Sequence, residues 1–206
     1  MALTITGAAL DAWALLAQNA VREGAAVDLS ESFASELHID VALGNTTAHT
    51  GTRILVQVSS AAADDEFWTT IQDFIALVGT ANTEVVLNNP LAAAASQIEV
   101  ADLTGFTVAT GGTLLAFLLD NTVANSELVR IVSTSVEGGN DLINLLDPVK
   151  REHAVTTSVL SNIAATYKVE IPMGALRARV LYDNLYDADG AAIYCRTRVI
   201  TTTAVA

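Results

Sequence analysis

The clearest candidate for metal chemistry in the sequence is a group of aspartates near the C-terminal end. Asp183, Asp187 and Asp189 lie close together and are followed by Gly190. Carboxylates gathered in a tight loop supply the hard oxygen ligands that Ca²⁺ prefers. Their spacing does not match an EF-hand loop, however, and Asp-Gly is also the sequence of an ordinary hairpin turn. We therefore expect a turn, with these three aspartates as the only calcium candidates and no other metal site.

The histidines and glycines give no catalytic or cofactor motif. His38, His49 and His153 are far apart in sequence and fit no compact metal-ligand spacing. His38 and Asp40 alternate along one expected strand, so both side chains would share a face, directed at solvent or at a partner. The Gly pairs at 111–112 and 138–139 fit neither a phosphate loop nor a dinucleotide-binding turn, and no Gly-x-Ser-x-Gly is present. We predict no catalytic residue and no cofactor.

The single cysteine, Cys195, excludes an intrachain disulfide. It lies within the strand-like run 193–199, where side chains alternate between two faces. We therefore predict a buried structural thiol rather than a nucleophile.

Four arginines occur as two pairs, each with a spacing of two residues. They are Arg177, Arg179, Arg196 and Arg198. Two residues that are two apart on a strand point to the same face. If the two strands were hairpin partners, the four guanidinium groups would form a basic ladder that contacts an acidic neighbour. The alternative is a solvated outer face whose aliphatic stems cover the sheet.

The composition is apolar and acidic. Hydrophobic residues make up 51% of the 206 positions, charged residues make up 16%, and the formal net charge is −13. This charge repels phosphate backbones and anionic lipid, so we expect neither nucleic acid nor a membrane as partner. No apolar run approaches the roughly 20 residues of a membrane-spanning helix. The apolar excess favours subunit contacts, with an alanine-rich monomer as the alternative.

Two segments have the apolar spacing of an amphipathic helix. The first predicts one or two turns in an extended N-terminal arm and involves Leu10, Trp13, Ala14 and Ala17. The second spans residues 66–78, and Asp64 or Asp65 would cap its start. Its expected apolar stripe is Phe67, Ile71, Phe74, Ile75 and Val78.

The rest of the chain alternates apolar and polar side chains with the period of two that is typical of strands. Turn residues separate these segments, and 137–141 is an expected hairpin loop. Strands are predicted at residues 3–6, 37–43, 53–58, 83–87, 98–100, 106–108, 114–119, 128–132, 142–146, 167–171, 175–182 and 192–201. Short strands at this spacing, with one short amphipathic helix, predict a mainly β fold.

The order of these segments suggests an insertion. We predict a β-sandwich from residues 36–94 and 160–206, with a small β-barrel module inserted at 96–157 and an N-terminal arm with a short helix at 1–35. Loop signals at Asn88-Asn89-Pro90 and near Asn162 mark the two breaks. A single continuous sandwich is the simpler alternative.

Two groups of residues resemble structural proteins of tailed phages. Residues 125–131 (Asn-Ser-Glu-Leu-Val-Arg-Ile), a hairpin, and then 145–148 (Leu-Leu-Asp-Pro) with His153 are similar to small β-modules that recur in such proteins. The flanking blocks 37–58 with Glu66-Phe67-Trp68, and 175–199 with its Asp-Gly turn, resemble accessory virion proteins of the same kind.

This resemblance implies a non-enzymatic component of a phage particle. The expected function is a capsid decoration (cement) protein that binds the major capsid protein or other virion proteins. A neck, tail or fibre-base accessory protein is the first alternative. The resemblance carries over no catalytic residue. We expect a homo-oligomer, with Leu3, Ile5 and Trp13 as interface candidates beside the four arginines.

Carbohydrate binding and catalysis are two further alternatives to a structural role. A carbohydrate-binding or adhesin domain would need exposed aromatic residues around a groove. Aromatic residues are only 5% of the chain, and Trp13 and Trp68 fall in helical, core-like patterns. An enzyme would need a reactive centre, which the sequence does not suggest. No signal peptide is recognisable, so we expect synthesis in the host cytoplasm and a final location in the virion.

Overall fold

The computed structural model describes residues 3–46, 50–63, 67–77, 83–104, 106–161, 164–184 and 192–204. The described elements are strands, apart from a 3₁₀ turn at Val123–Asn125. The chain divides into two compact units. Unit 1 comprises residues 1–41, 50–78 and 165–206, and unit 2 comprises residues 42–49 and 79–164. In sequence, the segment 79–164 therefore interrupts unit 1.

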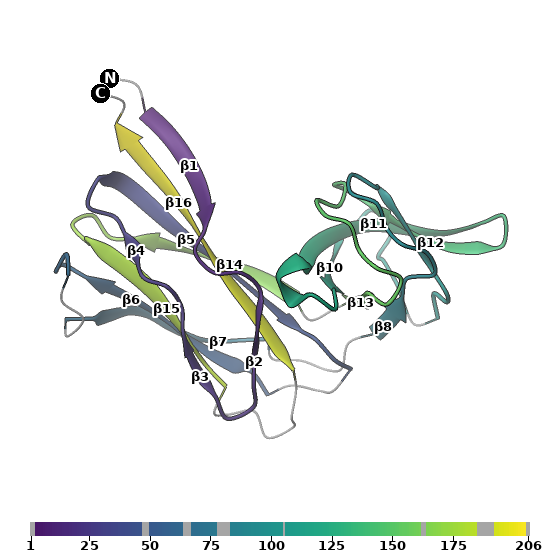
Figure 1. Cartoon of the computed structure of the whole chain (residues 1–206), viewed down its shortest axis with the longest axis horizontal. Helices are drawn as coiled ribbons and strands as arrows, with labels where there is room; N and C mark the ends of the chain where they lie inside the picture. The colour runs from purple at the N-terminus through teal and green to yellow at the C-terminus, as the bar shows by residue number, and fades with distance from the viewer. Residues whose placement is uncertain are drawn as a thin grey trace. The chain divides into compact units, whose positions relative to one another are not determined.

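Unit 1 is a β-sandwich of two sheets (Figure 1). One sheet contains β1 (Leu3–Ala9), β2 (Ala14–Leu16), β5 (Ser32–Leu43), β14 (Ala164–Ile171) and β16 (Ile193–Ala204). Its order is β1-β16-β5-β14, and β2 also pairs with β16. The other sheet contains β3 (Val21–Glu23), β4 (Val27–Asp28), β6 (Thr52–Ser59), β7 (Thr69–Ala76) and β15 (Arg177–Asp183). Its order is β3-β15-β6-β7, and β4 also pairs with β15.

Alternating side chains of both sheets fill the space between them. The residues with the least exposure include Leu37, Ile39, Val41, Ile54, Val56, Val180, Tyr182, Ile193 and Cys195, none more than 1% exposed. Two polar contacts also cross from sheet to sheet. The hydroxyls of Tyr182 and Thr197 are hydrogen-bonded, and Arg22 donates to the carbonyl of Cys195 at 3.1 Å. The sandwich core is thus mostly apolar, and these two contacts pair polar groups within it.

The N-terminal residues are part of the sandwich. β1 pairs antiparallel with β16, from Leu3 opposite Ala204 to Ala9 opposite Arg198. β3 and β4 pair with β15 of the other sheet. The predicted arm of residues 1–35 therefore supplies strands to both sheets.

Both helix predictions are wrong. Ala14–Leu16 form β2, and both Trp13, which precedes this strand, and Leu16, which ends it, are buried, at 3% and 2% exposure. The segment 69–76 is β7, which pairs with β6, and its β-branched residues favour that extended backbone. Phe67 and Ile75 of the expected apolar stripe are 63% and 60% exposed. Asp64, Asp65 and Val78 lie outside the described residues.

Unit 2 is a curled sheet of six strands, and the chain is mainly β, as the sequence predicts. The strands are β8 (Thr83–Val86), β9 (Gln97–Val100), β10 (Leu114–Leu119), β11 (Glu127–Glu137), β12 (Asn140–Leu145) and β13 (Ser158–Ser161), in the order β8-β13-β10-β11-β12-β9. The two end strands approach each other, because Asn88 donates its backbone N–H to Glu99 at 2.9 Å and Ala101 donates to Val86 at 3.3 Å.

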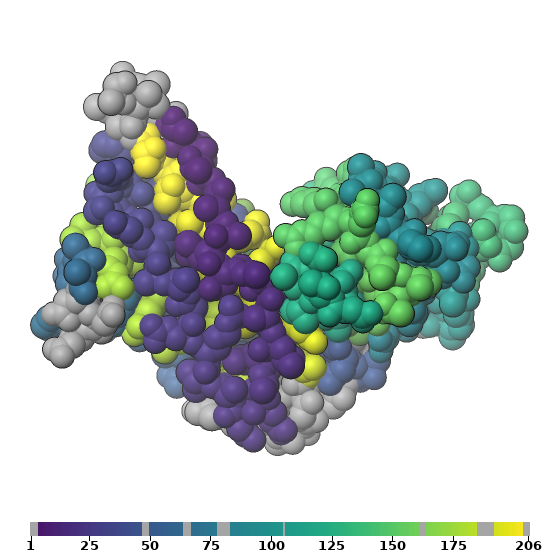
Figure 2. Space-filling model, in the orientation of Figure 1, coloured from purple at the N-terminus to yellow at the C-terminus, as the bar shows by residue number. Residues whose placement is uncertain are grey.

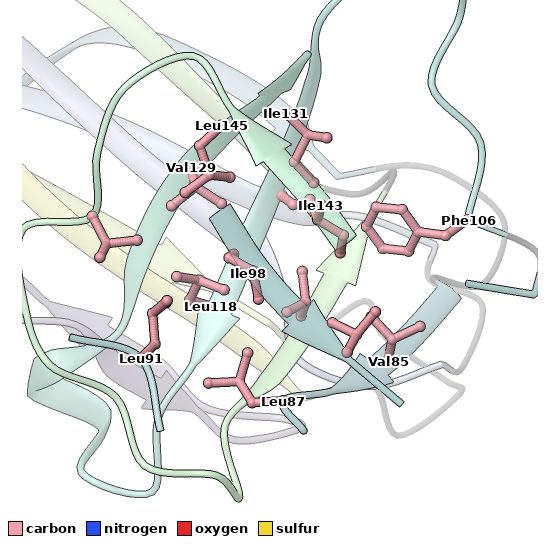
Figure 3. Close-up of a cluster of buried hydrophobic side chains, with 14 residues drawn as sticks. Val85, Leu87, Leu91, Ile98, Phe106, Leu118, Val129, Ile131, Ile143 and Leu145 are labelled. Atoms are coloured by element: carbon pink, nitrogen blue, oxygen red, sulfur yellow. The ribbon is translucent and has the colours of Figure 1, made fainter. Parts of the chain in front are cut away.

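The core of unit 2 lies inside this curl (Figure 3). Side chains from every strand of the sheet contribute, including Val85, Ile98, Leu118, Ile131, Ile143 and Val159. Phe106 also packs here, at 5% exposure. The strand predicted at residues 106–108 is absent, and these residues lie in a loop. An aromatic residue inserted from a loop fills the core without the alternation that a strand would show.

The strand predictions otherwise agree with the structure to within a few residues. Leu114–Leu119 is β10 with unchanged bounds, and Gly138–Gly139 turns the chain from β11 into β12. β3, β4 and β13 were not predicted as strands. Among the described residues, no helix has the length and hydropathy that crossing a bilayer requires.

Candidate functional site

Two buried ionic clusters and an apolar groove are candidate features among the residues that the structure describes. The first cluster lies in unit 2 around His153, whose side chain is fully buried. Its Nδ1 lies 3.1 Å from Asp120 Oδ2, and its Nε2 lies 2.9 Å from Glu127 Oε1. Thr157 donates its hydroxyl to Asp120 at 3.3 Å. The imidazole is therefore enclosed by two carboxylates.

Charge and burial act in opposite directions on His153. Burial alone lowers the pKa of the imidazole, but the hydrogen bonds and negative charges of Glu127 and Asp120 outweigh it, so the pKa is raised. For Glu127, burial raises the pKa, and the contacts with His153 and with the backbone N–H groups of Lys150 and Arg151 outweigh it. The pKa of Glu127 is therefore lowered. Below its raised pKa, His153 is a buried imidazolium between two acidic side chains.

The cluster of His153, Asp120 and Glu127 is suited to holding loops in place and poorly suited to catalysis. Asp120 follows β10, Glu127 begins β11, and His153 lies in the loop before β13, so the cluster ties three segments together. Glu127 also accepts the N–H groups of Lys150 and Arg151 at 3.1 and 3.3 Å. With both ring nitrogens engaged, His153 has no lone pair with which to activate a nucleophile.

The second cluster lies in unit 1 around Asp40 of β5, which is fully buried. Arg196 donates to Asp40 Oδ2 at 3.0 and 2.6 Å, and Arg198 donates to both carboxylate oxygens at 2.9 Å. The Thr166 hydroxyl adds a bond of 2.7 Å. Burial raises the pKa of Asp40, but these donors outweigh it and the pKa is lowered. Asp40 thus faces its own sheet neighbours instead of solvent.

The four arginines do not form the expected ladder. Arg196 and Arg198 lie on β16 and Arg177 and Arg179 on β15, and these strands belong to different sheets. The Arg177 and Arg179 guanidinium carbons lie 5.0 and 4.1 Å from the Trp68 ring centroid.

Trp13 takes part in the Asp40 cluster. The Arg196 guanidinium carbon lies 4.7 Å from the Trp13 ring centroid, a cation–π contact that covers one side of the cation. Arg198 keeps 36% of its side chain exposed, so an interface role for this residue stays a prediction.

The aspartate group is only partly described. Asp183 ends β15 and is 9% exposed, while Asp187 and Asp189 lie outside the described residues, as does His49. Among the residues that the structure does describe, no three histidine, cysteine or acidic side chains are grouped for a metal ion. The calcium site therefore stays a prediction.

Cys195 is a buried thiol, as predicted. It is fully buried in β16, and Arg22 approaches its sulfur at 3.1 Å. Burial raises the pKa of this thiol to about 11. Since the thiolate is the reactive form, Cys195 is inert while the sandwich is closed.

The apolar groove lies on unit 1 and has a volume of about 350 Å³. Its apolar lining includes Ile5 of β1, Phe33 of β5 and Met173, which are 73%, 55% and 86% exposed. Glu36 and Glu170 also line it. In Figure 2 the purple N-terminal residues run along the surface of this unit. Sequence analysis named Ile5 but missed Phe33 and Met173, because exposure of a lone apolar residue has no sequence signature.

No protein-family model and no curated protein matches the chain. Among solved structures, VP17, a capsid protein of bacteriophage P23-77, aligns over 99% of this chain and 98% of its own, with 9% identity and a TM-score of 0.21. The complex of VP16 and VP17, the two major capsid proteins of that phage, aligns over 98% and 100%, with 8% identity and a TM-score of 0.22. Scores this low assign neither a shared fold nor a function.

Proposed function

We propose that this chain is a structural protein of a tailed-phage particle. In this role it binds neighbouring capsid subunits as a decoration protein and stabilises the head without catalysing a reaction. The observation that carries the proposal is the apolar groove, where Ile5, Phe33 and Met173 are exposed close together. Exposed apolar side chains that cluster on a surface mark interaction sites more often than singly exposed apolar residues do.

The charge around the groove indicates what kind of surface it fits. Glu36 and Glu170 lie beside its apolar lining, and the whole chain carries a net charge of −13. A capsid subunit that offers an apolar protrusion flanked by lysine or arginine would be complementary in shape and in charge. Repeated over a shell, even a modest contact would reinforce the particle.

The two ionic clusters support a structural role. Every ring nitrogen of His153 and both carboxylate oxygens of Asp40 are engaged within the chain. Such satisfied buried groups stabilise one arrangement of the backbone and leave no reactive atom to a substrate.

Binding to emptied phage heads tests the proposal. We expect the purified chain to bind them and the double variant Phe33→Asp, Met173→Asp to bind more weakly by about 2 kcal/mol or more, since two contact residues become charged. The control variant Val136→Asp changes a residue of unit 2 that is 68% exposed. This variant should bind the heads as the wild type does. Heads that bind no chain, or bind the double variant equally well, would contradict the proposal.

The position on the particle separates a decoration protein from a neck, tail or fibre-base accessory. Immunogold labelling of purified particles should give a dispersed pattern over the whole head. A single focus at the neck or tail would support the accessory role instead.

A second candidate, carbohydrate binding, is favoured by one groove of unit 1. Phe67, which is 63% exposed, and Trp68 line it together with the hydroxyl-bearing Ser60 and Thr69. Aromatic faces beside hydroxyl groups suit a sugar ring, and the helical pattern that had assigned Trp68 to the core is wrong. A glycan array in which the chain binds one sugar class, and Phe67→Ala does not, would favour this function over the capsid role.

A further inference from the structure

The outer edge of β1 is the feature that carries a further inference. β1 ends the path of its sheet, and no described strand pairs with its outer side. Residues 4–9 are all exposed. An edge strand presents a row of backbone N–H and C=O groups that can pair with another strand.

Among the strands that end a sheet path, β1 is the one without an ionisable residue. The other strands at the sheet ends are β14, β3, β7, β8 and β9, and each contains at least one ionisable residue. Examples are Glu23 in β3, Asp73 in β7 and Lys168 in β14. Charged side chains on an edge hinder pairing with a further strand. β1, with the sequence Leu-Thr-Ile-Thr-Gly-Ala-Ala, has none.

The sequence of β1 is complementary to itself in an antiparallel register. With Thr6 opposite the same residue of a second copy, Ile5 lies opposite Gly7 and Thr4 lies opposite Ala8. Large residues then meet small ones, and threonine meets threonine, which is a favourable cross-strand pair. Gly7 is not needed for packing within the chain, because a Cβ there would meet nothing nearer than 4.0 Å. The open space beside it fits Ile5 of the second copy.

Charge further restricts where two copies can meet. Each copy carries −13, so they repel each other over most of their surface. An uncharged edge is where this repulsion is weakest and where backbone hydrogen bonds compensate for it.

We infer that two copies of this chain pair β1 with β1, antiparallel about a two-fold axis, and so join their four-stranded paths into one continuous sheet. This contact covers Ile5, now 73% exposed. One strand pair buries less than the roughly 1,600 Å² of a standard interface, so the dimer dissociates in the micromolar range or weaker. The inference goes beyond the proposed function, since self-association needs no phage particle.

Sedimentation of the full chain over a concentration series tests the pairing. The wild type should shift from monomer to dimer as concentration rises. Thr6→Glu places two carboxylates opposite each other at the two-fold axis, and Thr6→Lys places two ammonium groups there. Each variant alone should dimerise about tenfold more weakly or worse, because like charges meet. An equimolar mixture of the two should dimerise again, since a carboxylate then meets an ammonium group.

Matched controls isolate the edge from the change in net charge. Val136→Glu and Val136→Lys alter net charge equally, at a strand residue of unit 2 that is 68% exposed, and should dimerise like the wild type. Circular dichroism confirms that each variant is folded. A wild type that stays monomeric up to about 1 mM overturns the inference, as does Thr6→Glu dimerising normally or a mixture that stays monomeric. A monomer that binds phage heads would overturn this inference alone, and a dimer that binds none would overturn the proposed function alone.

Discussion

Two single residues, Asp40 in unit 1 and His153 in unit 2, show how this chain tolerates buried charge. Each is an ion removed from water, and each has groups of opposite charge on its polar atoms. Removing water from a charge is costly, so the paired arrangement adds little net stability on its own. Removing one partner of the pair lowers the stability strongly, because the remaining charge stays buried without its partner.

Asp40→Asn should therefore destabilise unit 1 by about 3 kcal/mol, since Arg196 and Arg198 lose their carboxylate while the shape is kept. The matched control is Asp73→Asn, which breaks the exposed bridge to Arg53 and should cost less than about 1 kcal/mol. Urea unfolding of the three proteins measures both differences. Equal losses in the two variants would show that burial of Asp40 does not matter.

The His153 cluster predicts a pH window of stability. The pKa of His153 is raised from 6.5, so its contribution is complete below that pH and is lost as pH rises through the folded pKa. The pKa of Glu127 is lowered from 4.5, so its contribution is complete above that pH and is lost as pH falls through the folded pKa. The cluster should therefore stabilise unit 2 most between about pH 4.5 and 6.5.

The variant His153→Leu isolates this window. Its free energy of unfolding, subtracted from that of the wild type at each pH, should give a curve with its maximum in the window and a decline on both sides. A difference that is flat from pH 4 to pH 9 would mean that His153 is not charged in the folded chain.

The site could be predicted only in part at the residue scale. Burial of Cys195 followed from the alternation of its strand. The partners of His153 did not, because Asp120 and Glu127 are 33 and 26 positions away along the chain, and nothing in the local pattern connects them. Likewise, the arginine spacing gave the correct faces on each strand but not the sheets to which the strands belong.

At the scale of elements, the turn between β11 and β12 depends on Gly138 and Gly139, with φ of 60° and 89°. Gly139→Ala should cost about 1–2 kcal/mol, because a Cβ disfavours this left-handed backbone. The control Gly7→Ala lies in extended backbone with space for a Cβ and should be nearly neutral. Thermal unfolding followed by circular dichroism compares the two, and equal effects would contradict the assignment.

Strands buried on a regular face were predictable from alternation, whereas the edge strand β7 was not. β5, β6 and β10 have buried apolar faces, so their periodicity is visible in the sequence. β7 is an edge strand in which five of the eight residues are exposed, and its apolar residues therefore imitate helical spacing. Pairing with β6, a contact distant from the local pattern, decides its structure.

At the scale of the whole molecule, we propose that the two units unfold separately. Segment 79–164 has its own core, distinct from the sandwich core. Calorimetry should then show two transitions, with His153→Leu lowering one and Asp40→Asn lowering the other. If both variants lowered a single shared transition, the units would be one cooperative domain, and the alternative of a continuous fold would be favoured.

The rate at which the thiol of Cys195 is modified can measure how often the sandwich opens. Because the sulfur is fully buried and its pKa is about 11, a maleimide reagent can modify it only in molecules whose two sheets have momentarily separated. Comparing the rate of modification in the free chain with the rate in the chain attached to a particle would show how far attachment suppresses separation of the two sheets.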